Sequence, residues 1–184
     1  METRLSVRYA PGTMRPCQEA VLARGACSLF LPASIVRERD GSCLFLYHTE
    51  GLVPLSMLDA IRASDLIELA AAILQGSAEA EDRYLFRGEY DVEQELIYLK
   101  QNGKRLHFAG MVWRMAGSSS GEEGGRKLRR DVADLLEIRS GSVQTEARGY
   151  MKKAGEIILR PHSGLYAAAN RLRLLEAEAE ACGY

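Results

Sequence analysis

Apolar and polar residues alternate along the front of the chain with the two-residue period of a β-strand. Residues 5–9 show this period, and residues 34–39 and 42–48 predict two more strands that flank Asp40-Gly41, a dipeptide typical of hairpin turns. Residues 43–47 within the second of these strands are nearly all apolar, which is typical of a central strand covered on both faces. Residues 18–23 are a further strand candidate. We therefore expect a small antiparallel sheet at the front of the chain.

A helical period replaces the alternation after Pro54. Residues 55–61 are a short helix candidate, and Ser64 with Asp65 provides an N-cap for a longer helix. The apolar residues of that helix recur at helical spacing: Leu66, Ile67, Leu69, Ala70, Ile73 and Leu74.

Further helical patterns fill the second half of the chain. We expect helices at 125–140 and 142–153, an apolar connector at 156–159, and a last helix that Ser163 opens. The far end of this last helix, 176–180, is polar and is expected to fray.

Between the helical stretches, residues 96–109 predict an inserted β-hairpin. Asn102-Gly103 marks its turn, because these residues accept the positive φ angles that short hairpin loops need. An acidic loop, 89–95, precedes the hairpin, and Gly110 follows it. The predicted fold class is α+β, with N-terminal antiparallel strands followed by a mainly helical part that carries one inserted hairpin.

We expect one compact domain with two parts. Residues 1–50 would form a strand-rich small lobe, and residues 51–184 would form a helical lobe. The glycine- and serine-rich stretch 117–125 is predicted to be a mobile loop. A chain of 184 residues can bury a sizeable core without disulfides or bound metal.

Charge and cysteine usage narrow the functional classes. The chain has 24 basic and 25 acidic residues and a formal net charge of −1, so no overall field attracts nucleic acid or acidic membranes. Its four cysteines form no C-x-x-C pair, which is the usual spacing of zinc and thioredoxin-like sites. No secretory leader and no apolar run of about 20 residues is visible. We expect a cytoplasmic protein with free thiols.

Three segments, in their chain order, resemble parts of protein kinases. CLFLYHTEGLVPLSML (43–58) resembles the last small-lobe strand and the hinge, and SDLIELAAAILQGSAEAEDRYL (64–85) resembles the long helix ahead of the catalytic loop. LIYLKQNGKRLHFAG (96–110) resembles the hairpin that leads into the Asp-Phe-Gly motif. The resemblance covers roughly residues 20–175 and implies a kinase-like fold.

The chain is also similar to two kinds of degenerate kinase-like domain. One is an uncharacterised domain that stands ahead of forkhead-associated domains in Gram-positive bacteria, and the other is the cytoplasmic pseudokinase subunit of type VII secretion systems. The first similarity rests on Asp40-Gly41, Tyr47, Tyr84-Leu85 and Ile97-Tyr98-Leu99, which follow that family's order.

The residues that kinase catalysis needs are missing from these segments. A kinase uses a strand lysine on the phosphates, an Asp that accepts the hydroxyl proton, and an Asn and an Asp that hold magnesium. The first lysine here is Lys100, and there is no Gly-x-Gly-x-x-Gly loop. RGEYDVEQE (87–95) stands where the catalytic loop is expected, and Phe108-Ala109-Gly110 stands in place of Asp-Phe-Gly. Asp91 would have no metal-binding partners, so the resemblance implies a pseudokinase and not an enzyme.

No residue stands out as catalytic, cofactor-binding or metal-binding. The three histidines, His48, His107 and His162, lack metal-ligand spacing. Residues 89–95 alternate acidic and other side chains and are a cation-site candidate, but they lack the calcium-loop pattern, which favours a solvated loop. Residues 118–120 are serines and are candidate phosphorylation sites.

Five residues are candidate contacts for a protein partner: Trp113, Arg126, Lys127, Arg129 and Arg130. The four cations form a short basic run at a helix start, which suits phosphate or phosphoprotein contact, although a solvated helix face is the commoner outcome. Trp113 would anchor either a partner or the core.

The leading hypothesis is a catalytically inactive, kinase-like protein-interaction module in bacterial signalling or secretion assembly, with protein partners and no cofactor. The alternative is a small-molecule-binding or enzymatic domain of unrelated α+β fold, in which Tyr47, His48, Glu50 and the acidic loop line a pocket between sheet and helices. A third possibility is a structural subunit that forms a homodimer through its last helix.

Overall fold

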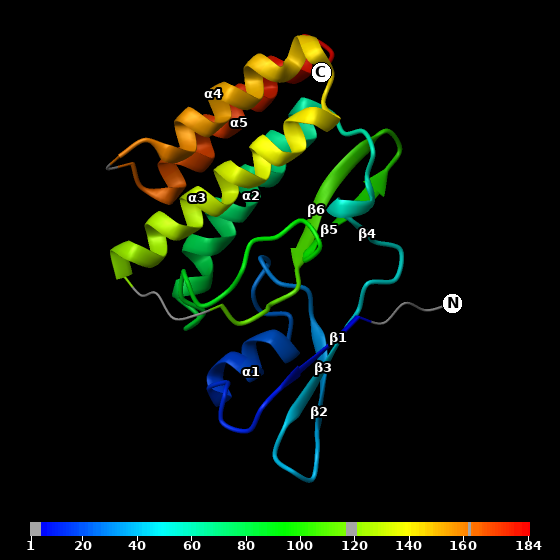
Figure 1. The fold of residues 1–184 in the computed structure, drawn as a ribbon, viewed down its shortest axis with the longest axis vertical. Helices are drawn as coiled ribbons and strands as arrows, with labels where there is room; N and C mark the ends of the chain where they lie inside the picture. The colour runs from blue at the N-terminus through cyan, green and yellow to red at the C-terminus, as the bar shows by residue number, and fades with distance from the viewer. Residues whose placement is uncertain (1–4, 117–120, 162) are drawn as a thin grey trace.

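The computed structural model describes residues 5–116, 121–161 and 163–184, and its strands and helices separate into a front part and a larger helical part (Figure 1). The front part consists of β1 (Leu5–Tyr9), α1 (Pro16–Ala23), β2 (Ala33–Arg37) and β3 (Cys43–Tyr47).

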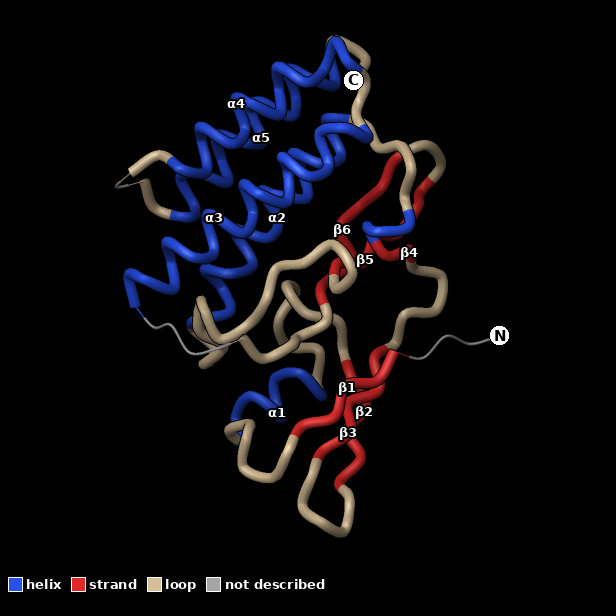
Figure 2. The backbone as a smooth tube through the Cα atoms, viewed as in Figure 1, coloured by secondary structure: helices blue, strands red, loops and turns tan. Residues whose placement is uncertain are grey.

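The remaining elements form the helical part. They are β4 (Val53–Pro54), η1 (Leu55–Met57), α2 (Ala63–Glu81), β5 (Ile97–Asn102), β6 (Arg105–Met111), α3 (Gly121–Arg139), η2 (Ser140–Ser142), η3 (Thr145–Ala147), α4 (Arg148–Leu159) and α5 (Leu165–Ala181). Figure 2 shows the strands, in red, in two groups, with α2 to α5 stacked on the side away from the front sheet. The predicted α+β class, with N-terminal strands and a mainly helical part carrying one hairpin, is confirmed.

The front sheet is antiparallel with the strand order β1-β3-β2, so β3 is central as predicted. Phe45 of β3 lies opposite Val7 of β1 and Ile35 of β2. Burial alternates along β3, because Phe45 is fully buried whereas Leu44 and Leu46 are only partly buried. One face of the sheet is therefore fully covered by the protein and the other only partly, which corrects the prediction of a strand buried on both faces.

Residues 18–23, a strand candidate from sequence, belong to the helix α1. Pro16 stands at the first helical position, where its fixed φ angle suits a helix and its missing N–H costs nothing. The Gln18 side chain accepts a hydrogen bond of 3.1 Å from the backbone N–H of Arg15, which caps the helix start. These start signals outweigh the weak apolar period of so short a segment.

The inserted hairpin is present, with its turn one residue later than predicted. Asn102 pairs with Arg105, so the loop consists of Gly103 and Lys104. Gly103 has a φ of +61°, which places the positive φ at the first loop position, as in type II′ turns. Strand β6 continues past the predicted end to Met111.

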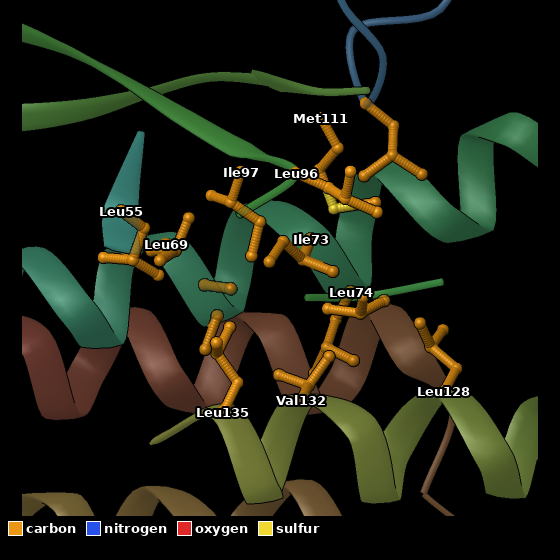
Figure 3. Close-up of a cluster of buried hydrophobic side chains, with 14 of the residues drawn as sticks. Leu55, Leu69, Ile73, Leu74, Leu96, Ile97, Met111, Leu128, Val132 and Leu135 are labelled. Atoms are coloured by element: carbon orange, nitrogen blue, oxygen red, sulfur yellow. The ribbon is translucent and has the colours of Figure 1, made fainter. Parts of the chain in front are cut away.

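The core is centred on α2, which is buried around most of its circumference. Its apolar residues Leu69, Ile73 and Leu74 are buried, and Figure 3 shows them in one cluster with Ile97 and Met111 of the hairpin and with Leu128, Val132 and Leu135 of α3. Helix α5 packs along another side of α2. A helix covered on so many sides needs apolar residues at nearly every position, which matches the sequence of α2.

The helix boundaries in the second half differ from the predicted ones. Helix α3 begins at Gly121, so residues 121–125 are helical and not part of a loop, and Glu122 and Glu123 in its first turn match the positive end of the helix dipole. Residues 117–120, which include the candidate phosphorylation sites, lie outside the described residues.

Two short 3₁₀ turns, η2 and η3, occupy the start of the stretch predicted as a helix at 142–153. The helix α4 begins at Arg148 and includes residues 156–159, which were predicted to be a connector.

Helix α5 is ordered to Ala181 and does not fray at 176–180. Arg105 of β6 explains this, because its guanidinium lies 2.9 Å from Glu176 and 2.8 Å from Glu180. Asp65 on α2, whose side chain is almost fully buried, is 3.7 Å from the same guanidinium. These long-range ion pairs join β6, α2 and the end of α5.

The division into lobes at residue 50 stays a prediction, as does homodimer formation. The apolar face of α5 is buried against α2 within the same chain, so it is not free to pair with a second copy. Within the described residues, every helix is too short or too polar to cross a lipid bilayer.

Neighbouring leucines of α5 provide a test of this packing. Leu172 is fully buried, whereas the Leu174 side chain is 70% exposed. We expect Leu172→Ala to lower the free energy of unfolding by about 2–5 kcal/mol, because it leaves a cavity against α2, and Leu174→Ala to change it by less than about 0.5 kcal/mol. Urea unfolding followed by circular dichroism measures both. Equal effects of the two substitutions would contradict the placement of α5.

Candidate functional site

The candidate site is the seam between the front sheet and the helical part. Tyr9 of β1 and Phe45 and Tyr47 of β3 point from the covered face of the sheet into this seam, where they meet Trp113 at the end of the hairpin. The ring centroid of Tyr9 is 5.1 Å from that of Phe45 and 5.4 Å from that of Trp113. All four side chains are buried, so aromatic rings fill this part of the seam.

The backbone carbonyl of Trp113 is the polar centre of this cluster. It accepts a hydrogen bond of 2.5 Å from the Tyr9 hydroxyl and one of 3.0 Å from the Tyr47 hydroxyl. Burial raises the pKa of both tyrosines, because the interior disfavours the charged tyrosinate. The two hydroxyls are thus committed to a protein carbonyl as neutral donors.

The end of β6 is held against the front part by backbone hydrogen bonds. The N–H of Met111 donates to the carbonyl of Leu29, and the N–H of Leu31 donates to the carbonyl of Met111, both at 2.8 Å. Gly110 makes this contact possible, since a Cβ there would lie 3.0 Å from the backbone nitrogen of Leu31 and its φ is +144°. Phe108 and Ala109, just before it, are partly buried and carry no charge.

The loop ahead of the hairpin is clamped to α1. Glu89 lies 2.7 Å from the guanidinium of Arg15 and 2.9 Å from the side-chain amide of Gln18. The Arg15 guanidinium also lies over the ring of Phe86, 5.2 Å from its centroid. These contacts fix the loop against the start of α1, beside the seam.

The rest of the acidic run faces α3. Asp91 is 3.3 Å from Arg114 and 3.8 Å from Lys127, and Glu93 is 2.5 Å from Arg114. Asp91 is therefore neutralised by two cations of the protein, and its carboxylate is not available as an unpaired base. Within the described ranges no group of three or more Asp, Glu, His or Cys side chains converges in a way that would hold a metal ion.

The predicted partner contacts separate into three groups. Trp113 is fully buried, so its side chain belongs to the core and not to a contact surface, because the aromatic cluster encloses it. Lys127 binds Asp131 at 2.6 Å, and Arg129 donates to the carbonyls of Ile158, at 2.5 Å, and Ser163. Only the other two members of the basic run, Arg126 and Arg130, are exposed on α3.

The two described histidines have ordinary polar partners. His48 lies 3.1 Å from the Ser34 hydroxyl, and His107 lies 3.4 Å from Glu68. His162 lies outside the described residues.

The residues predicted to line a pocket between sheet and helices do not come together in the structure. Tyr47 is buried in the aromatic cluster, and His48 is turned to Ser34 of the front sheet. The hollow that the acidic loop borders is walled by α3 instead.

Comparison with known proteins gives information on the fold. No family model matches the sequence, and no curated protein matches it either. A variant of the PknI kinase domain of Mycobacterium tuberculosis is similar in structure, with a TM-score of 0.57 and 12% identity over 92% of this chain and 84% of that one. A divergent kinase of Toxoplasma that lacks the glycine-rich loop has a TM-score of 0.56 and 15% identity, over 93% of this chain and 66% of that one.

The chain has a protein-kinase-like fold. The finer similarities, to the Gram-positive domain and to the secretion pseudokinase, stay predictions.

Sequence reasoning located the hairpin ends but missed the aromatic cluster and the clamp on Glu89. Tyr9 and Tyr47 both fall on inward positions of alternating strands, which is the one signal that could have brought them together. Gln18 falls in the segment 18–23, whose pattern suggested a strand, and Arg15 lies outside every element predicted from the sequence.

The two hydroxyls on the Trp113 carbonyl can be separated by mutation. We expect Tyr9→Phe and Tyr47→Phe each to lower the free energy of unfolding by about 1 kcal/mol. The double variant should lose more than the sum of the two, since a buried carbonyl is then left without a donor. A double-mutant cycle in urea measures this coupling, and Tyr166→Phe on the exposed face of α5 is the matched control. A purely additive cycle would contradict the shared acceptor.

Alkaline pH tests the same cluster. Burial raises the pKa of Tyr9, Tyr47 and Tyr90, so the folded chain holds these protons more tightly than the unfolded chain. The contribution of these tyrosines to the free energy of unfolding should be constant below about pH 10, the ordinary tyrosine pKa, and should fall as the pH rises beyond it. Urea unfolding at stepped pH, with tyrosinate absorbance as the second readout, measures this. Ionisation of all eight tyrosines before unfolding would rule it out.

Proposed function

We propose that this chain is a catalytically inactive, kinase-like protein-interaction module. The observation that carries the proposal is the chemistry of the seam, where a kinase places its phosphate- and metal-binding charges. Aromatic rings and neutral hydroxyls occupy the seam here, and the hairpin ends in Phe108-Ala109-Gly110.

The charged groups near the seam are engaged elsewhere. Arg8 is the only basic residue of β1, and its guanidinium lies 2.5 Å from Glu38 and 3.2 Å from Asp40 at the tip of the front hairpin. Asp91 is paired with Arg114 and Lys127. Arg8 is therefore already paired and not free to bind a phosphate, and Asp91 is not free to hold a metal ion or to accept a proton from a hydroxyl.

A kinase-like scaffold without this chemistry is suited to binding other proteins. The proposed setting is the cytoplasm of a bacterium, in signalling or in the assembly of a secretion system. This setting rests on the resemblance of Tyr84-Leu85 and Ile97-Tyr98-Leu99 to the Gram-positive domain, and on the similar degenerate kinase-like domain of the secretion pseudokinase.

Nucleotide binding tests the inactive state. We expect no magnesium-dependent rise in melting temperature with ATP, because aromatic rings and neutral hydroxyls occupy the seam. Binding would be visible in this assay, since a ligand at one hundred times its Kd adds about 2.7 kcal/mol to the free energy of unfolding. An active protein kinase in the same assay is the positive control. A clear magnesium-dependent shift, together with phosphoryl transfer that Asp91→Ala abolishes, would overturn the proposal.

A further inference from the structure

A groove of about 300 Å³ lies between the loop ahead of the hairpin and α3. Five carboxylates line it: Asp91, Glu93, Glu95, Asp131 and Asp134. We call this surface the acidic groove. It lies on the outside of the helical part and does not include the aromatic seam.

The acidic groove has more negative charge than the protein itself neutralises. Lys127 pairs with Asp91 and Asp131, and Arg114 pairs with Asp91 and Glu93, so two cations face five carboxylates. Glu95 and Asp134 are exposed and form no hydrogen bond or ion pair with any other residue in the described part of the chain. Two carboxylates on opposite walls of the groove are thus left for an external cation.

The floor of the groove is apolar. Val92 and Leu135 are buried beneath the carboxylates, and the Ile138 side chain is 66% exposed at one end. A large aliphatic side chain that reaches into solvent beside unpaired charges is typical of a surface that is covered when a partner binds. The groove therefore offers an apolar contact together with its negative charge.

The charge and shape of the acidic groove limit the kinds of molecule that can bind there. Phosphate-rich partners such as nucleic acids and anionic membranes are repelled by the excess of carboxylates. The carboxylates come from a loop and from a helix, and in the described residues they do not converge on a point where a metal ion would sit. A chain that spreads several positive charges over a few residues, with an apolar side chain among them, matches this arrangement.

We infer that the acidic groove binds a short basic segment of a partner protein. Lysine or arginine side chains of that segment pair with Glu95 and Asp134, and an apolar side chain covers Ile138. The inference rests on the proposed role of the chain as a protein-interaction module and names the chemistry of the partner.

Fluorescence anisotropy with a synthetic peptide tests the inference on the full chain. The probe is a labelled peptide in which arginines and leucines are separated by serines, and the comparison peptide carries glutamate in place of arginine. The chain should bind the arginine peptide at low salt, and high salt should weaken the binding, because exposed charge pairs are screened. It should not bind the glutamate peptide.

Charge reversal identifies the groove as the binding site. Glu95→Lys with Asp134→Lys should weaken binding about tenfold or more, and Ile138→Asn should weaken it several-fold. The matched control is Glu50→Lys with Glu146→Lys, which changes the net charge by the same amount at exposed positions outside the groove. Melting curves by circular dichroism confirm that each variant is folded.

Three results would overturn the inference: no binding of the arginine peptide, equal binding of the glutamate peptide, or equal loss in the groove variant and its control. None of these results bears on the nucleotide assay, so the failure of the groove and the failure of the inactive-module proposal are distinguishable. If the chain bound ATP and also bound the arginine peptide through the groove, only the inactive-module proposal would fail.

Discussion

The exchange of backbone hydrogen bonds between Met111 and the segment around Leu29 and Leu31 holds the two parts of this protein together. It brings two backbones so close that only glycine fits at position 110. It also fixes the direction of the chain at Trp113, whose carbonyl then points at Tyr9 and Tyr47. The closure of the seam thus follows from one contact at the end of β6, and the aromatic rings add burial to a geometry that the backbone has already set.

Features determined by local sequence were predictable, and features determined by distant contacts were not. The alternation in residues 5–9 and the apolar period of α2 depend on one face being buried, so the sequence pattern and the structure agree there. The end of α5 looked ready to fray because its glutamates are polar. The end of α5 is ordered because Glu176 pairs with Arg105, which precedes it by 71 residues in the sequence. A pair so far apart in sequence cannot be predicted from local sequence patterns.

The same distinction applies to the site. The hairpin ends were located from the turn signal at Gly103 and from Gly110, and the missing carboxylate at Phe108-Ala109 was visible in the sequence. Trp113 was an open choice between core and surface, because a tryptophan is compatible with both. Its burial depends on Tyr9 and Phe45, which are remote in sequence, so only the folded chain decides it.

The acidic run 89–95 shows how residues that look equivalent in sequence take different roles. Glu89 is used inside the molecule, where Arg15 and Gln18 join it to α1. Asp91 and Glu93 form ion pairs with cations on neighbouring segments. These pairs stabilise the loop and leave neither carboxylate free to bind a metal ion or accept a proton. Glu95 has no hydrogen-bond or ion-pair partner among the residues that the structure describes, and it lines the same groove as Asp134. The kinase-like fold therefore displays unpaired negative charge on an outer surface, where we propose that it binds a basic segment of another protein.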